Sequence, residues 1–430
     1  MIEGNKKVVI IGAGIAGLSA GTYLKKTGKY DILFIEASNK PGGRIKTENI
    51  DNFILDNGLH LFFTANPYLL ELLDIDKLNL KYFESGAIIM KNHSYRKIYD
   101  PLQHPKHLLK SIFSSICTLG DKIKIIKRRA ELKSISFDKV FEKYEVKTSS
   151  ILKKRKFSSL IIKNIFQPVF SQLFMENELT TSRRMFEFYL KLMADGKMAI
   201  PAKGTEEIPK QLASNFEKEN FIFNTKAVEI NENIVTLDNG EKIQADAFLI
   251  ATEQNGFYSK IKNTEINNNQ RGVTCFYFSA NKRPYKEKLI CFNANNPKLV
   301  SSMIVLTNIS HHFAPHNKVL IAVNINGVST IDENDLETEI KDEISKVFGS
   351  QVYDWQKIKS YKINNAIPNQ DFVLGKRQAS EIKISDNIYV CGDHLINSSL
   401  YGAMRSAKVA IEMLHNDFFP SKKSSSKKNK

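Results

Sequence analysis

Residues 8–21 read VVIIGAGIAGLSAG, an apolar run followed by three closely spaced glycines and a helical pattern. Each glycine has its own physical role, because Gly12 permits a tight turn, Gly14 lets phosphates approach the backbone, and Gly17 allows the helix to pack closely on the strand. The positive end of that helix would then face the phosphates. The stretch therefore predicts a strand, a turn and a helix that bind a dinucleotide. The contacts expected from it are Gly12, Gly14, Ile15, Ala16 and Gly17.

A second apolar run, residues 32–35, ends in Glu36, which lies 19 residues beyond Gly17. An acidic side chain at about this spacing accepts hydrogen bonds from the ribose of a bound dinucleotide. The same unit binds NAD and FAD, so these residues alone leave the choice between the two cofactors open.

Two further segments narrow that choice. The residues Pro41, Gly42, Gly43 and Arg44 follow Glu36 closely, and residues 387–393 read NIYVCGD, a buried strand that ends in Gly-Asp before a helix. With these segments the sequence resembles the FAD-dependent amine oxidase superfamily, which includes phytoene desaturases and protoporphyrinogen oxidases. The resemblance covers most of the chain and implies FAD as the cofactor.

Carried over residue by residue, the resemblance implies distinct roles along the cofactor. Glu36 would hold the adenosine ribose, and Val228 would offer backbone groups to adenine. Asp393 would meet ribityl or phosphate oxygens, and the final helix would direct its dipole at the flavin pyrimidine, which stabilises a reduced, anionic flavin. A strand-end turn with a helix cap is the plain structural alternative for the Gly-Asp pair. The implied FAD contacts are Glu36, Gly43, Arg44, Val228, Gly392, Asp393, Gly402 and Ala403.

The cofactor segments also predict the organisation of the chain. We expect an α/β, Rossmann-like FAD-binding domain built from three chain segments, with an inserted α+β substrate domain. The first insertion looks helical, whereas the second contains VTCFYFSA and VLIAVNI, which are typical of strands. The substrate domain would therefore have a sheet floor and a helical cap. The expected FAD-binding segments are 1–85, 204–252 and 366–415, and the expected substrate and cap segments are 86–203 and 253–365.

The net charge of +16 is concentrated in two places. Residues 101–165 carry 16 Lys and Arg against 5 Asp and Glu, and residues 421–430 add five lysines and no acid. The second piece is polar and of low complexity, so we expect a disordered basic tail at 421–430. The first piece is amphipathic, and either docks on an anionic membrane or forms a solvated lysine face. No aromatic-rich basic motif accompanies these lysines, so we expect no nucleic-acid partner.

The cysteine spacing indicates whether the chain binds a metal, and the hydropathy indicates where the protein is located. Four widely scattered cysteines have no metal-ligand spacing, so we predict reduced thiols and no metal site. The chain has no uninterrupted run of 18 apolar residues, and we therefore expect no membrane-spanning helix. A cytoplasmic protein, peripheral at most to the inner face of the membrane, is the resulting expectation.

No residue pattern identifies a catalytic group, and the catalytic residues stay unknown at this stage. His60, in LDNGLHLF, and His394 are candidate acid, base or orienting groups, although a packed histidine is the plainer interpretation of each. Tyr361 and Asn364, in YKINNAIP, resemble a substrate-domain segment that returns to the flavin. Lys282 is a weak candidate for the lysine that positions water in amine oxidases.

The combined expectation is an FAD-dependent oxidoreductase that oxidises or desaturates an apolar or partly apolar organic substrate by hydride transfer to flavin. Only one Gly-x-Gly-x-x-Gly occurs, so electrons would leave to oxygen, a quinone or another carrier, without a second nucleotide site. A redox-neutral flavin-dependent isomerase and an amine oxidase are the alternatives. The amine oxidase alternative is weakened, because Ser399 stands where the amine-oxidising branch has a tyrosine of its aromatic cage.

Overall fold

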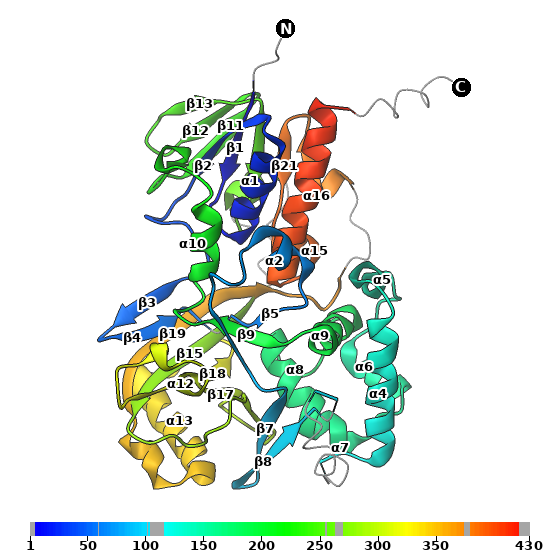
Figure 1. The fold of residues 1–430 in the computed structure, drawn as a ribbon, viewed down its shortest axis with the longest axis vertical. Helices are drawn as coiled ribbons and strands as arrows, with labels where there is room; N and C mark the ends of the chain where they lie inside the picture. The colour runs from blue at the N-terminus through cyan, green and yellow to red at the C-terminus, as the bar shows by residue number, and fades with distance from the viewer. Residues whose placement is uncertain are drawn as a thin grey trace.

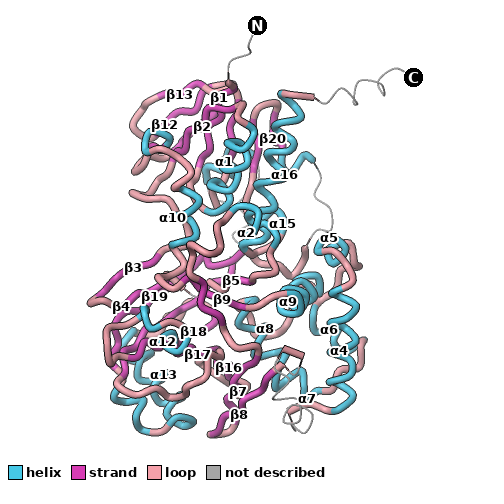
Figure 2. Tube along the Cα trace, in the orientation of Figure 1, coloured by secondary structure: helices cyan, strands magenta, loops and turns pink. Residues whose placement is uncertain are grey.

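The computed structural model describes residues 5–58, 60–100, 102–103, 116–253, 256–262, 270–373 and 379–420. The predicted tail at 421–430 and the part of the basic region at 104–115 lie outside the described residues. Figure 1 shows an upper body, which holds the first strands and the last helix, above a lower body of sheet and helices. In Figure 2, the strands of the lower body lie at its left and centre, and helices make up its right side.

A six-stranded sheet forms the centre of the upper body, in the order β10-β2-β1-β14-β21-β20. Its strands are β1 (Lys6–Ile11), β2 (Tyr30–Ile35), β10 (Phe221–Ile222), β14 (Ala247–Ile250), β20 (Lys383–Ser385) and β21 (Ile388–Val390). All neighbours pair in parallel except β20 and β21. Val8, Val9 and Ile10 are fully buried, because helices and other strands cover both faces of a parallel sheet. The α/β fold predicted from the opening stretch is confirmed.

Two helices, α1 (Ile15–Thr27) and α16 (Leu400–Phe418), pack against each other in the upper body. Gly21 of α1 faces Phe34 of β2 so closely that a Cβ at this position would overlap the Phe34 ring. The lack of a side chain therefore lets the helix lie directly on the sheet.

A seven-stranded sheet forms the floor of the lower body, in the order β19-β15-β18-β17-β16-β7-β8. Its strands are β7 (Gly86–Lys91), β8 (Ser94–Tyr99), β15 (Gln270–Ala280), β16 (Cys291–Asn293), β17 (Ser302–Val305), β18 (Val319–Asn326) and β19 (Gln356–Pro368). The first insertion was expected to be helical, but its first residues form the strands β7 and β8. The apolar run in β7 pairs in parallel with β16, a partner far away in the sequence.

Helices make up the cap beside this sheet (Figure 1). They are α4 (Leu119–Lys133), α5 (Phe137–Phe141), α6 (Thr148–Lys154), α7 (Ser159–Ile161), a π-helical turn (Ile162–Phe166), α8 (Gln167–Phe174) and α9 (Arg183–Asp195). Aromatic side chains such as Phe141, Phe170 and Phe188 form their common core. Among the described helices, none combines the length and the apolar character that crossing a membrane requires.

The remaining elements are short strands, helices and 3₁₀ turns in both bodies and between them. The remaining strands are β3 (Thr47–Ile50), β4 (Phe53–Asp56), β5 (Phe62–Phe63), β6 (Leu80–Tyr82), β9 (Met198–Pro201), β11 (Ala227–Asn231), β12 (Ile234–Leu237) and β13 (Lys242–Gln244). The remaining α-helices are α2 (Pro67–Leu72), α10 (Glu207–Ala213), α11 (Gly256–Lys262), α12 (Leu306–Ile309), α13 (Glu333–Phe348), α14 (Ala379–Ile382) and α15 (Asp393–Ile396). Short 3₁₀ turns occur at Lys218–Asn220, His311–Phe313 and Ser350–Asp354.

Candidate functional site

A cavity of about 800 Å³ extends from the glycine-rich turn of the upper body to the cap and the floor. One part of its lining comes from the upper sheet and its loops. The other part, which we call the lower wall, consists of the lining residues in segments 61–69, 172–192, 270–273 and 363–368. The cavity therefore joins the predicted dinucleotide site to the lower body of the molecule.

The glycine-rich turn has the geometry that its sequence predicts. Gly12 has a φ of +103°, and a Cβ there would lie 2.9 Å from the carbonyl oxygen of Ala251. A Cβ on Gly17 would overlap the carbonyl oxygen of Gly12, so α1 needs glycine at this position. Gly14 differs, because the nearest atom to its Cβ position is Gly43 Cα at 3.7 Å. Gly14 lines the cavity, and the space beside it is open to a ligand.

Glu36 follows β2 and connects it to the glycine-rich turn. Its Oε2 accepts a hydrogen bond of 2.7 Å from the Ala13 amide, and its Oε1 accepts from the amide and the hydroxyl of Ser38 at 2.8 and 2.6 Å. A carboxylate has about four acceptor positions, so these bonds leave capacity for a ligand hydroxyl. Glu36 lines the cavity, which is compatible with the expected contact to ribose.

The cavity continues along the start of β11. Thr225, Lys226 and Ala227 line it, and the lining ends one residue before Val228, whose side chain is 42% exposed. An adenine contact at Val228 would therefore involve its backbone, as the resemblance implies. Thr252, just beyond β14, has a buried hydroxyl with no hydrogen-bond partner in the described part of the chain. It also lines the cavity, where a polar ligand would satisfy it.

Arg44 and Asp393 both line the cavity and form an ion pair. Their Nη2 and Oδ1 atoms are 2.7 Å apart, and Arg44 Nη1 donates to the carbonyl oxygen of Ala366 at 3.1 Å. Asp393 raises the pKa of Arg44, against the opposing effect of burial, so the guanidinium stays charged. The pair joins the loop after Glu36 to the start of α15, two segments that are far apart in the sequence.

The N-terminus of α16 opens onto the same cavity. Ser399 is the N-cap and accepts a hydrogen bond of 3.1 Å from the amide of Gly402. A Cβ on Gly402 would overlap the carbonyl oxygen of Asn397, so glycine lets α15 and α16 join tightly. Ser399, Tyr401 and Ala403 line the cavity, and the helix end supplies a partial positive charge there. Ser399, which the sequence marked only as a missing cage residue, therefore has a structural role.

The cavity includes two of the candidate catalytic residues. His60 lines it, with Nε2 3.3 Å from the carbonyl oxygen of Asn57, and burial followed by the charge of Arg44 lowers its pKa to about 4. His394 also lines the cavity, and its ring meets the ring of Tyr258 edge to face at 5.4 Å. Both histidines lie beside the expected cofactor position.

The other candidates lie outside the lining. Tyr361 is buried in β19 against the ring of Tyr277, 5.9 Å away, and Asn364 of the same strand is exposed. Lys282 lies exposed in the turn after β15. The cavity lining includes Ile363, a neighbour of Tyr361 and Asn364 in β19, but none of these three candidates.

The lower wall consists mainly of side chains that sequence reasoning did not identify. Apolar and aromatic residues dominate it, among them Leu61, Phe63, Phe188, Leu192 and Val273. They come from strand and helix segments that only the folded chain brings together. An aromatic-rich sequence in α8 and α9 was the available signal, but it equally predicts ordinary core packing.

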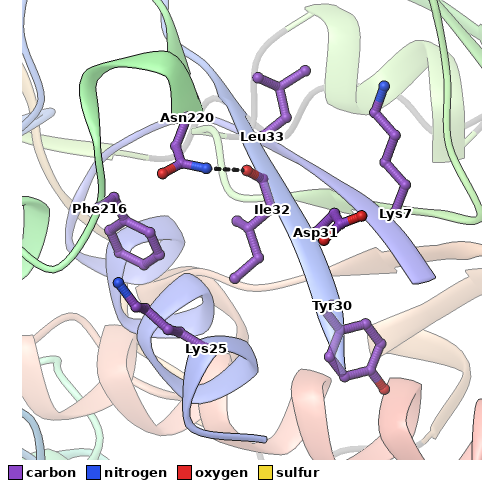
Figure 3. A pocket seen from close by; sticks show the side chains of 8 residues that line it. All are labelled: Lys7, Lys25, Tyr30, Asp31, Ile32, Leu33, Phe216 and Asn220. Atoms are coloured by element: carbon purple, nitrogen blue, oxygen red, sulfur yellow. Dashed lines mark hydrogen bonds between the residues drawn. The ribbon is translucent and has the colours of Figure 1, made fainter. Parts of the chain in front are cut away.

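A second hollow of about 490 Å³ lies beside β2, away from the glycine-rich turn. Figure 3 shows Lys7, Lys25, Asp31 and Phe216 around it, with Asn220 Nδ2 donating to the Ile32 carbonyl oxygen at 2.9 Å. The two hollows share no lining residue. All predicted cofactor residues that line a hollow lie in the larger cavity.

Comparisons with known proteins agree with this geometry. A family model described as flavin containing amine oxidoreductase matches residues 15–410. Coproporphyrinogen III oxidase of Bacillus subtilis (strain 168) is 31% identical over 102 residues, which are 22% of this chain and 22% of that protein. The 15-cis-phytoene desaturase of Glycine max is 43% identical over 63 residues, which are 14% of this chain and 11% of that protein. The matches thus span a quarter or less of these two relatives.

Similarity of fold extends much further than similarity of sequence. The crystal structure of an oxidoreductase from Methanosarcina mazei matches with a TM-score of 0.71 and 15% identity. The match covers 94% of this chain and 100% of that chain. At this identity it shows a common fold.

Proposed function

The chain belongs to the flavin-containing amine oxidoreductase family, and on that premise we propose that it is an FAD-dependent oxidoreductase acting on an apolar or partly apolar organic substrate. The observation that carries the proposal is the larger cavity, because it joins the proposed dinucleotide cradle to an apolar wall. An enzyme that transfers a hydride between a substrate and a flavin needs these two surfaces in contact.

The residues of the upper body fit the cofactor. Gly14 and Gly43 leave room for a pyrophosphate close to the backbone, and Glu36 has free acceptor capacity for ribose hydroxyls. The Arg44–Asp393 pair and the positive end of α16 provide fixed charges beside the flavin position. Bound FAD would supply a two-electron acceptor for the substrate's hydride.

The lower wall supports the assignment of the substrate. Its apolar side chains would exclude water from the reacting carbon and orient the substrate against the cofactor. Among the described lining residues of this wall there is no Asp or Glu that would receive an ammonium group. This favours oxidation or desaturation of a carbon skeleton over amine oxidation. Oxygen, a quinone or another carrier would then accept the electrons.

Anaerobic reduction of the purified flavoprotein tests this function. A polyene, a porphyrinogen and a primary amine are added separately, and a compound that is a substrate bleaches the flavin absorbance. We expect no bleaching by the amine. Bleaching by the amine alone would make the chain an amine oxidase. Turnover of the polyene or porphyrinogen without consumption of oxygen or a quinone would instead establish the redox-neutral isomerase.

We also propose that the cap docks on an anionic membrane, at the inner face of the cytoplasmic membrane. Leu119, Ile123 and Ile126 of α4 are exposed and lie at helical spacing on one side, and Lys122 and Lys127 flank them. Ile123 alone is 61% exposed. Apolar insertion together with cationic attraction is the combination that holds interfacial helices on lipid.

Co-sedimentation with vesicles tests the docking. We expect binding to vesicles that contain phosphatidylglycerol, weaker binding to pure phosphatidylcholine, and loss of binding in the variant Ile123→Asp. Leu70→Asp, at an equally exposed position on α2, is the matched control and should bind like the unmodified protein. Binding that ignores anionic lipid and salt, or that survives Ile123→Asp, would overturn the proposal.

A further inference from the structure

One polar side chain of the lower wall is held in a fixed orientation. Gln172 belongs to α8, is only 8% exposed and lines the cavity. Its Oε1 accepts a hydrogen bond of 2.9 Å from the hydroxyl of Ser302. In the part of the chain that the structure describes, Gln172 Nε2 has no hydrogen-bond partner and is not among the fully buried polar atoms. The amide nitrogen is therefore the polar atom of Gln172 that is available to a ligand.

A buried relay accompanies this orientation of the amide. Asn324 Nδ2 donates to Ser302 Oγ at 3.1 Å, and both residues are buried in the floor sheet. Ser302 has one hydroxyl proton, which it gives to Gln172 Oε1. The acceptor end of the Gln172 amide is thus occupied, and its two N–H groups are left as donors.

The charge of the surroundings restricts what those donors can bind. The charged residues of the cavity lie outside the lower wall, among them Glu36, Arg44 and Asp393. Within the described lining of the lower wall there is no Lys, Arg, Asp or Glu. Moving an ionised group into such a wall without a counter-ion is strongly unfavourable, whereas a neutral oxygen needs only a hydrogen-bond donor.

We propose that Gln172 is a specificity-determining residue, whose Nε2 donates a hydrogen bond to a neutral oxygen on an otherwise apolar substrate. A carbonyl, hydroxyl or ether oxygen has the required chemistry, and a carboxylate does not. Ser302 and Asn324 are positioning residues that act through the Gln172 amide. The inference rests on the proposed function, because it takes the lower wall as the substrate surface.

Three probes of nearly the same shape test this inference. Methyl naphthyl ketone carries a neutral oxygen, ethylnaphthalene carries none, and naphthoate carries a charge. Their dissociation constants are measured from the change that each causes in the absorbance of the bound flavin. We expect the ketone to bind about tenfold more tightly than the hydrocarbon, which is typical of one hydrogen bond to a buried donor. Tighter binding of naphthoate than of the ketone would overturn the requirement for a neutral group.

Substitutions test whether the preference for the ketone comes from Gln172. Gln172→Leu should lower the affinity for the ketone about tenfold and leave that for ethylnaphthalene unchanged. Gln167→Leu, on the same helix but outside the cavity lining, is the matched control and should leave both affinities unchanged. If the ratio of the affinities for the ketone and for ethylnaphthalene stays the same in Gln172→Leu, the preference does not come from Gln172.

Ser302→Ala tests the relay separately. Without the serine hydroxyl the amide of Gln172 is free to turn, so the ketone-to-hydrocarbon ratio should fall while ethylnaphthalene binds as before. An unchanged ratio would show that the relay does not orient the amide. The flavin content of each variant is measured first: a protein without flavin contradicts the proposed function, whereas a flavin-loaded protein without the preference contradicts only this inference.

Discussion

At the scale of single residues, Gly14 is the position where we expect folding and cofactor binding to be separable. Its backbone has a φ of −78° and a ψ of −176°, which any residue adopts, and only Gly43 Cα lies near its Cβ position. We predict that Gly14→Val folds normally but binds FAD at least about tenfold more weakly, because the side chain occupies space beside the pyrophosphate position. FAD titration and the Tm of the FAD-free protein measure these two effects.

The control for this substitution is Gly120→Val. Gly120 lies near the start of α4, where a Cβ would meet only the Thr118 hydroxyl at 3.8 Å, and it is outside the cavity lining. This variant should bind FAD like the unmodified protein. If Gly14→Val also retains full affinity while folded, the glycine-rich turn is not the pyrophosphate site.

His60 should be uncharged throughout the physiological range. Burial, and then the charge of Arg44, lower its pKa to about 4, so the imidazole would act as a neutral hydrogen-bonding group. Between pH 6.5 and 4 the unfolded chain binds a proton at His60 that the folded protein does not bind. The contribution of neutral His60 to stability is therefore complete above the unfolded pKa of 6.5 and falls as the pH drops toward 4. An NMR titration of the ring should have a midpoint near pH 4, and a midpoint near 6.5 would contradict this account.

At the scale of elements, Glu187 of α9 joins the cap helices. The residue is fully buried, and the cations around it come from α4, the loop before α6, the end of α6 and the start of α9. Its cationic partners are Arg128, Lys143, Arg155 and Arg183. Burial alone would raise the pKa of Glu187, but these four charges outweigh it and lower the pKa to about 2.

Removing this charge should destabilise the cap. Glu187→Gln leaves four cations without their shared partner, and we predict a loss of about 3 to 5 kcal/mol in the free energy of unfolding, measured with urea. Because the folded pKa lies below the unfolded value of 4.5, the contribution is complete above pH 4.5 and falls as the pH drops toward 2.

Glu131→Gln provides the comparison for Glu187. Glu131 is half-exposed, and its ion-pair partner within the described chain is Arg128 at 2.7 Å, so its removal should change the stability by less than about 1 kcal/mol. Equal effects of the two substitutions would show that the cap does not depend on the buried carboxylate.

Some elements were predictable from the sequence and others were not. The strand, turn and helix at 6–27 were predictable because their signals are local: an apolar run, three glycines and a helical period. The strand β7 was missed because its apolar run is equally compatible with a buried helix, and its pairing with β16 is not local. Gln172 was missed for a related reason, since a glutamine in an aromatic-rich helix has no sequence signal until Ser302 is placed beside it.

At the scale of the whole molecule, the chain brings a predictable glycine-rich turn and its neighbours against a less predictable lower wall. Glu36 was identified from its spacing, and Arg44 and Asp393 from the resemblance that their segments support. The structure gathers all three around one cavity. Tyr361 and Lys282 were placed by resemblance alone and lie outside its lining. The lower wall is harder to predict because it is assembled from distant segments, whereas the proposed cofactor cradle would have to match one constant cofactor.

The absorbance spectrum of the purified full-length protein tests the central claim most directly. We predict the near-ultraviolet and blue bands of a flavin, about one FAD per chain after reconstitution, and a rise in Tm on addition of FAD, since a ligand that binds only the folded state stabilises it. A colourless, folded protein that takes up no added FAD and shows no shift in Tm would contradict the account.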